Sequence, residues 1–356
     1  LNHSAGDRFA DPDRQASPVF DFSSQPRKAP LKIPRRFTSR SFAVIGFSVA
    51  LYAAVALIFG WDEIKRELSG FPAWQLVALG GLSLLNYGLR FWRWEIYLRS
   101  LGARIPLRDS IGLYFATYVM VITPGKIGEI FKAGILREKY SVPLAKGLPV
   151  VLAERIYDFL AVLTLAAVGI FYWPGPLTGM TTGLLAAAAV PVFLILFQNR
   201  ALRTRLLARA SRSDLLARHR IGLDDAMDFL SRLLGFRQAS LSLVISTLAW
   251  SCECLGLWLV CRGLGFPIPA GEAFFVYAAG TLVGSLSFLP GGLGGTEATI
   301  IWLLGTLAMP GATAAAVALL VRLFTLWLAV IIGLVFFLAF RRLFFANPES
   351  ASGHPQ

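Results

Sequence analysis

Long apolar runs separated by short polar segments dominate the chain. The runs lie at about residues 41–60, 73–91, 108–122, 147–172, 177–197, 238–261, 272–289, 296–308 and 313–340. Several of them reach the ~20 residues that an α-helix needs to cross the hydrocarbon core of a bilayer. Backbone groups inside a bilayer must be satisfied within the protein, which a helix of this length achieves by itself. The pattern therefore predicts an all-α polytopic membrane protein.

Two junctions between runs are rich in Pro and Gly, namely ITPGKIGEIFK (122–132) and FLPGGLGGTEATI (288–300). Such residues break helices, and at membrane depth a break persists only where it is buried in protein or lines a polar cavity. The sequence thus predicts two broken re-entrant hairpins, over residues 109–135 and 271–309. The expected helix-break positions are Pro124, Gly125, Pro290, Gly291 and Gly292.

Composition and charge then orient the chain. Hydrophobic residues make up 56% and charged residues 15% of the chain, which excludes an ordinary soluble enzyme. The net charge of +13 would suggest nucleic-acid binding, but 27 of the 34 Lys and Arg residues fall in 27–40, 90–108, 126–146, 200–237 and 341–342. The positive-inside rule places these segments in the cytoplasm, with both termini, and predicts about six full spans. No nucleic-acid partner is expected.

The same reading divides the chain into segments. Residues 1–40 are predicted to be a disordered, basic cytoplasmic tail, and residues 41–342 a transmembrane domain. Within that domain, residues 198–237 interleave Arg with Leu, which predicts a cytoplasmic amphipathic loop on an anionic lipid surface. Residues 343–356 form a C-terminal tail.

An internal repeat is visible in the sequence. The string RSLGARIPLRDSIGLY (99–114) aligns without a gap on RGLGFPIPAGEAFFVY (262–277), and further along Arg155 corresponds to Arg322. Three predicted crossings separate the copies, so halves at about 73–172 and 238–340 would be inverted relative to each other. The alternative is chance recurrence of Leu, Gly and Pro. Inverted repeats with discontinuous helices are typical of transporters that bind substrate near the bilayer midplane.

Ionisable residues within predicted spans are costly and therefore candidates for function. Glu154, Arg155 and Asp158 share a helix face, where Arg155 and Asp158 form either a closed ion pair or a gate. Arg322 has no carboxylate within one helical turn, so it requires a partner elsewhere or a ligand anion. Glu253 is interpreted either as an inter-helix hydrogen-bonding residue or as a site residue.

The residues after each break are the second group of candidates. Helix N-termini attract anions such as phosphate, so the re-started helices are expected to meet a headgroup. Glu129 and Glu297 are expected either to meet a cationic headgroup or to carry a proton, or else to cap these helices, as Thr296 could also do. Lys126 and Lys132 are expected to snorkel to the interface. The substrate-binding candidates are Lys126, Gly128, Glu129, Glu154, Arg155, Asp158, Gly294, Thr296, Glu297 and Arg322.

Cysteine, histidine and nucleotide motifs exclude several chemistries. The three cysteines, Cys252, Cys254 and Cys261, lie in one apolar run without CxxC spacing, and they are predicted to be packing residues. His3, His219 and His354 lie in tails or a basic loop, which disfavours histidine-based catalysis or haem ligation. No Walker motif is present, so ATP is not expected as a direct energy source. Neither a cofactor nor a metal site is predicted.

The strings RFWRWEIYLRSLG, ITPGKIGEIFKAGILRE, VVLAERIYDFLAV, FLPGGLGGTEATI and LLVRLFTLW resemble the lysylphosphatidylglycerol synthase transmembrane (flippase) family over about residues 41–342. The family's ERxxD string stands here as Glu154, Arg155 and Asp158. The resemblance implies a bacterial inner-membrane flippase for a phospholipid, aminoacyl-phospholipid or related envelope lipid. The short tails leave no room for the aminoacyl-transferase domain of some relatives, so synthase activity is not expected.

Two other functions remain open from the sequence. One is an integral-membrane enzyme that modifies lipid headgroups, with Glu154 and Asp158 as acid and base. The other is a non-catalytic partner of a hopanoid or glycolipid synthesis pathway. The expected partners are a membrane lipid with a phosphate or cationic headgroup, an anionic lipid surface, and lipid-synthesis enzymes.

Overall fold

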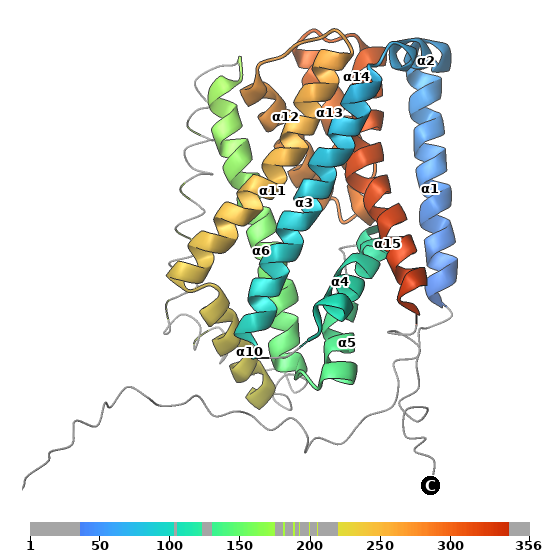
Figure 1. Ribbon diagram of the computed structural model, residues 1–356. Coiled ribbons are helices and arrows are strands. Elements are labelled where there is room, and N and C mark those ends of the chain that lie inside the picture. Colours follow the sequence, from blue (N-terminus) through green and yellow to red (C-terminus); the bar gives the residue numbers. More distant parts are fainter. Residues whose placement is uncertain are drawn as a thin grey trace, which may run out of the picture.

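The computed structural model describes residues 36–102, 105–122, 130–174 and 220–341, and the single positions 181, 188, 192, 199 and 205. Every regular element within these ranges is helical (Figure 1). The expected helix-break residues Pro124 and Gly125 and the candidates Lys126, Gly128 and Glu129 lie outside the described residues, as does most of the run at 177–197.

Helices α1 (Arg36–Phe59) and α3 (Ala73–Ser100) run between the two ends of the molecule, and the short α2 (Trp61–Ser69) lies at one end (Figure 1). Helix α1 ends at Gly60, whose φ of 81° lies in the left-handed region that glycine adopts without strain. The short α2 then lies at 92° to the second half of α1. Helix α3 runs from the end occupied by α2 to the opposite end (Figure 1).

The next elements begin at that opposite end. Helix α4 (Leu107–Ala116) continues into the 3₁₀ helix η2 (Thr117–Ile122), and α5 (Ile130–Tyr140) lies beside α4 near the same end (Figure 1). Helix α6 (Leu144–Gly169) then crosses most of the molecule and ends in a short 3₁₀ turn (Ile170–Tyr172).

The second half of the chain contains a broken helical pair. After α10 (Arg220–Leu233), α11 (Phe236–Gly263) runs to the end where α2 lies, and α12 (Ala270–Leu286) begins there (Figure 1). The expected break is present as a 3₁₀ turn, η5 (Pro290–Gly292), before α13 (Gly295–Thr306). Gly291 and Gly292 have φ angles of 62° and 68°, which explains glycine at both positions.

A single long path returns across the molecule at the end of the described chain. It consists of α14 (Gly311–Arg322), the π-helical turn η6 (Leu323–Trp327) and α15 (Leu328–Ala339). This path and α11 are the two described helices that are long and apolar enough to cross a membrane, and the bent pair α1–α2 is a third if it counts as one span. Helices α3 and α6 have 28 and 26 residues but carry more charge.

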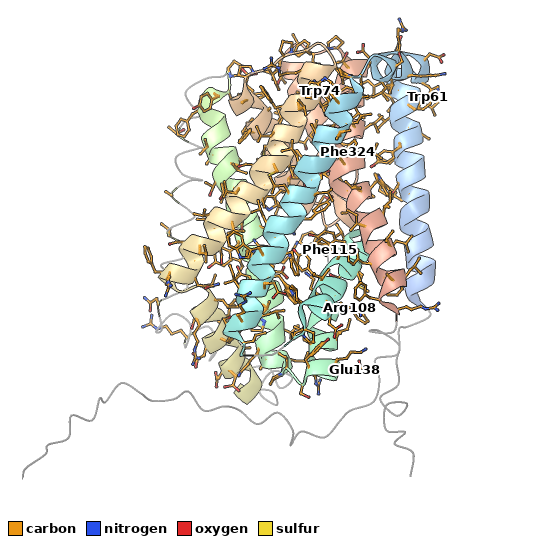
Figure 2. The ribbon with its side chains drawn as sticks, viewed as in Figure 1. Trp61, Trp74, Arg108, Phe115, Glu138 and Phe324 are labelled. Atoms are coloured by element: carbon orange, nitrogen blue, oxygen red, sulfur yellow. The ribbon has the colours of Figure 1, made fainter. Side chains whose placement is uncertain are left out.

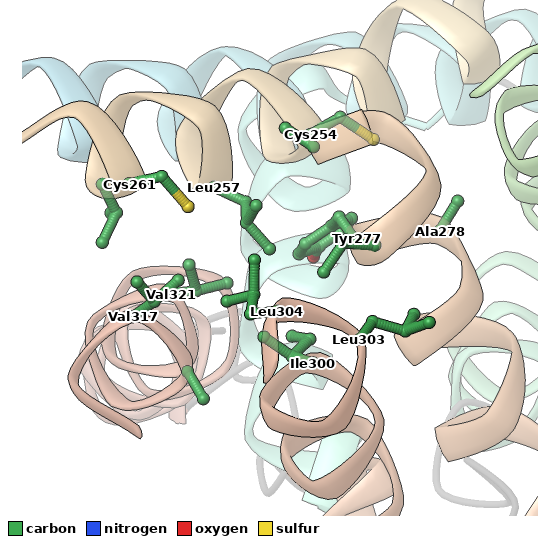
Figure 3. Packing of buried hydrophobic residues seen from close by; sticks show 14 of the residues in the cluster. Cys254, Leu257, Cys261, Tyr277, Ala278, Ile300, Leu303, Leu304, Val317 and Val321 are labelled. Atoms are coloured by element: carbon green, nitrogen blue, oxygen red, sulfur yellow. The ribbon is translucent and has the colours of Figure 1, made fainter. Parts of the chain in front are cut away.

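Apolar side chains form two main clusters. One joins α11, α12, α13 and α14 through residues such as Leu257, Ile300, Leu304 and Val317, and it includes Cys254 and Cys261 (Figure 3). All three cysteines are buried and free, as expected for packing residues. The other cluster is aromatic and lies around α3, α4 and α6.

The two ends of the molecule differ in their exposed side chains. Trp61 and Trp74 are 61% and 63% exposed and lie at one end, whereas Arg108 and Glu138 lie at the other (Figure 2). Large apolar side chains such as Leu57, Val77 and Val335 are exposed along the helices between these ends. An apolar flank bordered by tryptophan is the exterior expected of a protein in a bilayer.

Candidate functional site

A cavity of about 350 Å³ lies among α3, α6, α11, α12, η5 and the α14–α15 path. Its volume falls within the range of ligand-binding pockets. Helices from both halves of the chain contribute to its wall, and its charged or hydroxyl-bearing lining includes Arg90, Arg155, Asp158, Glu253, Thr296 and Arg322. Four of these six residues, Arg155, Asp158, Thr296 and Arg322, are substrate-binding candidates from the sequence, and Glu253 is the residue whose role the sequence left open, so the fold brings part of the predicted set together.

Asp158 is the centre of an arginine cluster on one wall. Its Oδ2 lies 2.7 Å from Nη2 of Arg90 and 3.1 Å from Nη2 of Arg155, and its Oδ1 lies 2.9 Å from Nη2 of Arg93. The predicted pair of Arg155 and Asp158 is present, but it is not closed on itself, because two arginines of α3 share the carboxylate. Among the described residues, this wall therefore has more guanidinium than carboxylate charge.

The position of α3 corrects the sequence analysis. The charge count places Arg90 and Arg93 in a cytoplasmic segment, 90–108, but α3 continues to Ser100, and Arg93 is fully buried. Arg93 bonds to Asp158, to the hydroxyl of Ser246 on α11 and to the backbone oxygen of Glu154, and these partners compensate for its burial. The spacing of Arg90 and Arg93 by three residues was the available signal, because it places both on one helix face.

Glu154 faces a different part of the interior. Its Oε2 lies 3.2 Å from Nζ of Lys132 on α5, and the Lys132 ammonium lies 5.0 and 4.3 Å from the ring centroids of Trp94 and Tyr114. Lys132 is buried, so the expectation that it snorkels to the interface was wrong. An ion pair and two aromatic faces replace the water that snorkelling would provide. Glu154 does not line the cavity.

The second ion pair lies beside the broken helix. Nε of Arg322 lies 2.8 Å from Oε1 of Glu297, and Nη2 of Arg322 lies 2.5 Å from the carbonyl oxygen of Gly291. The other oxygen of Glu297 accepts a hydrogen bond of 2.8 Å from the backbone N–H of Gly294, which is the N-cap of α13. Glu297 therefore caps the re-started helix and also pairs with Arg322.

Two details of the break differ from expectation. Thr296 is not the N-cap, because that position belongs to Gly294, and Thr296 lines the cavity instead. Gly291 and Gly292 also line the cavity, whereas Pro290, Gly294 and Glu297 do not. Arg322 has a protein partner 25 residues earlier in the chain, which sequence spacing alone did not identify.

One edge of the cavity is apolar and open. Phe159 of α6 is 45% exposed, and Phe288 and Leu289 beside η5 are 73% and 39% exposed. All three residues line the cavity and also reach the outer surface. The cavity thus combines a charged interior with an apolar rim.

The family model described as lysylphosphatidylglycerol synthase TM region matches residues 43–333. A UPF0104 membrane protein of Methanothermobacter thermautotrophicus is 25% identical over 319 residues, which cover 83% of this chain and 92% of the relative. A UPF0104 membrane protein of Methanocaldococcus jannaschii is 23% identical, with coverages of 85% and 96%. One from Pyrococcus horikoshii is also 23% identical, with coverages of 81% and 95%. These relatives are archaeal, whereas the sequence resemblance implied a bacterial protein.

Proposed function

The chain belongs to the lysylphosphatidylglycerol synthase TM region family, and from that membership we propose that it moves a polar-headgroup lipid between membrane leaflets. The substrate class is a phospholipid, an aminoacyl-phospholipid or a related envelope lipid. The membrane is the cytoplasmic membrane, with both termini on the cytoplasmic side. The family match and the charged cavity with its apolar rim support the proposal.

We propose six crossings, formed by α1, α3, α6, residues 177–197, α11 and the α14–α15 path. The α4–α5 and α12–α13 segments enter from opposite ends of the molecule, and their positions in Figure 1 support this arrangement. Two hairpins of this kind make an inverted repeat, and the cavity lies where the halves meet. A site at that position is accessible in turn from each side in alternating-access transporters.

The single observation that carries the proposal is the arginine cluster on Asp158. Guanidinium groups bind phosphate through paired charge-assisted hydrogen bonds, in the same way that they bind carboxylate. A lipid phosphate can therefore replace Asp158 as the partner of Arg90 or Arg155. Arg322 on the other wall has Glu297 as its partner at 2.8 Å and offers a second exchange of the same kind.

The apolar rim supports a role in lipid transport in particular. A charged headgroup alone in hydrocarbon is costly, and the arginine-lined cavity lowers that cost. Phe159, Phe288 and Leu289 line an edge where acyl chains can remain in the bilayer while the headgroup occupies the cavity. This division between charged interior and apolar rim suits an amphiphile better than a water-soluble ion.

The test is a translocation assay with purified protein in vesicles of phosphatidylethanolamine and phosphatidylglycerol. The vesicles contain a trace of phosphatidylglycerol or phosphatidylethanolamine with a reducible fluorophore on one acyl chain. A membrane-impermeant reductant added outside quenches only the fluorophores in the outer leaflet. We expect the wild type to expose label from the inner leaflet, and Arg155→Ala and Arg322→Ala to lose this activity. Arg137→Ala serves as the control, because Arg137 is exposed at the end of α5.

The same vesicles separate the rival functions. If both cavity variants transport as well as the wild type, the assigned site is wrong. If no labelled lipid moves in the wild type, lipid transport is wrong for these headgroups. Mass spectrometry of the recovered lipids would instead reveal a new species if the protein modifies headgroups.

A further inference from the structure

Glu253, a carboxylate of the cavity, differs in its partners from the other buried carboxylates of the described chain. Glu253 of α11 lines the cavity and is 4% exposed. Within the part of the chain that the structure describes, its side chain forms neither a hydrogen bond nor an ion pair. By contrast, Asp158, Glu154 and Glu297 each pair with an arginine or a lysine. Glu253 is thus an almost fully buried acid that faces the proposed lipid site without a direct counter-charge.

The groups around Glu253 come from four helices. Tyr87 and Arg90 of α3, Tyr277 of α12 and Arg322 of α14 line the same cavity as Glu253. Arg155 and Asp158 of α6 line the same cavity, and Cys252 and Cys254 are its neighbours on α11.

Both nearby arginines are engaged elsewhere. Arg90 pairs with Asp158 at 2.7 Å, and its guanidinium carbon lies 5.5 Å from the ring centroid of Trp250. Arg322 pairs with Glu297 at 2.8 Å. These cations act on Glu253 only at longer range. Among the buried carboxylates Glu154, Asp158, Glu253 and Glu297 of the described chain, Glu253 is therefore the one without a directly paired cation.

An ionised carboxylate at this depth is costly, whereas the neutral acid is not. A second negative charge in the same cavity increases that cost, because like charges in a shared site favour protonation of one of them. We propose that Glu253 binds one proton when an anionic lipid headgroup enters the cavity, so that lipid and proton are carried together. The step is Glu253 carboxylate plus a proton giving the neutral acid, and no covalent bond to the lipid changes. This inference rests on the proposed lipid transport.

Linkage gives the direction of the pH effect. If binding of the headgroup takes up one proton, headgroup affinity rises as the pH falls, by up to about tenfold per pH unit while Glu253 is ionised in the empty protein. Glu253→Gln resembles the neutral acid and removes this dependence. Glu253→Asp keeps a carboxyl group and retains it.

The experiment uses the full chain in detergent micelles with dihexanoylphosphatidylglycerol, a short-chain lipid without an amine. Isothermal titration calorimetry in buffers of different ionisation enthalpy counts the protons taken up on binding. At alkaline pH, where Glu253 is ionised in the empty protein, we expect about one proton per bound lipid for the wild type and Glu253→Asp, and none for Glu253→Gln. Glu138→Gln is the matched control, because Glu138 is exposed at the end of the molecule (Figure 2). Equal uptake by Glu253→Gln and the wild type, or binding without uptake in the wild type, overturns the proposal.

A second measurement does not depend on transport. Infrared difference spectra between acid and alkaline pH, recorded on protein in vesicles, detect the carbonyl stretch of a buried protonated carboxyl group. We expect Glu253→Gln to lose a band that Glu138→Gln keeps. A band unchanged in Glu253→Gln overturns the proton site. If Glu253→Gln loses the band but the wild type moves no labelled lipid, Glu253 is a proton site and the proposed lipid transport is wrong.

Discussion

Arg322 shows how a single side chain connects the broken helix to the cavity. It lines the cavity, pairs with Glu297 and donates to the carbonyl oxygen of Gly291. The side chains of Arg322 and Glu297 are only 9% and 2% exposed, so removing either partner leaves the other charge buried and poorly solvated. The pair therefore holds the break between α12 and α13 at a defined distance from α14.

Replacing Arg322 by Met tests this role. Glu297 would remain buried without its partner, and we expect the free energy of unfolding to fall by about 3–5 kcal/mol. The double variant Arg322→Met with Glu297→Gln removes both charges and should recover most of the loss. Thermal unfolding in detergent compares the stability of the single and the double variant with that of the wild type. Equal destabilisation in the single and double variants would show that lost packing, rather than the unpaired charge, is responsible.

At the residue scale, the sequence predicted contacts along a helix but not between helices. The pair of Arg155 and Asp158 follows from a spacing of three residues on α6, and it is present at 3.1 Å. Arg322 and Glu297 are 25 residues apart, so their contact depends on how α13 packs against α14. The sequence places Arg93 on the cytoplasmic side because a count of Lys and Arg residues does not distinguish a buried arginine from a solvent-exposed one.

At the scale of elements, the backbones of α15 and η2 approach closely at Gly333. A Cβ atom added at Gly333 would lie 2.2 Å from the backbone nitrogen of Val119 and 2.7 Å from the carbonyl carbon of Tyr118. Backbone atoms of this kind cannot move aside as a flexible side chain would. Glycine at this position is therefore a requirement of the packing of α15 against η2.

Gly333→Ala should separate these two elements. We expect a loss of about 1–3 kcal/mol in stability, as for overpacked cores. Gly81→Ala in α3 is the control, because an added Cβ there meets nothing within 4 Å. That variant should be neutral or more stable by about 0.5–1 kcal/mol, since alanine favours helix. Chemical or thermal unfolding compares them, and equal effects of the two changes would contradict the proposed close contact.

The apolar runs predicted most of the boundaries of the helices that they cover within a few residues. The runs at 238–261 and 313–340 became Phe236–Gly263 and Gly311–Ala339. The run at 73–91 ended too early, because α3 continues through Arg93 and Arg99 to Ser100. The ion pair of Arg93 with Asp158 of α6 stabilises that extension, and a single sequence contains no signal for the partner helix.

At the scale of the whole molecule, the proposed membrane orientation places α2 outside and the α4–α5 end in the cytoplasm. The six crossings and the inverted repeat stay predictions, whereas the different character of the two ends is visible in Figure 2. The native cysteines are buried, so they give little background in labelling experiments. New cysteines at each end can therefore report on the orientation.

We expect Glu138→Cys to react with a membrane-impermeant maleimide only in inside-out vesicles. Ser69→Cys at the end of α2 should react only in the opposite orientation. Both positions are exposed in the structure. Reaction of both from the same side would contradict the proposed topology, and denatured samples confirm that each cysteine is present.

The π-helical turn Leu323–Trp327 has a consequence for the α14–α15 path as a whole. It is a wider turn than α-helix, and Tyr87 of α3 donates to the Phe324 carbonyl at 3.0 Å. Each residue of an α-helix rotates the chain by about 100°. The wider turn therefore rotates the residues after it relative to those before it. Arg322, before the turn, lines the cavity, while Gly333, after the turn, contacts η2. A regular α-helix over the same residues would orient one of these two positions differently.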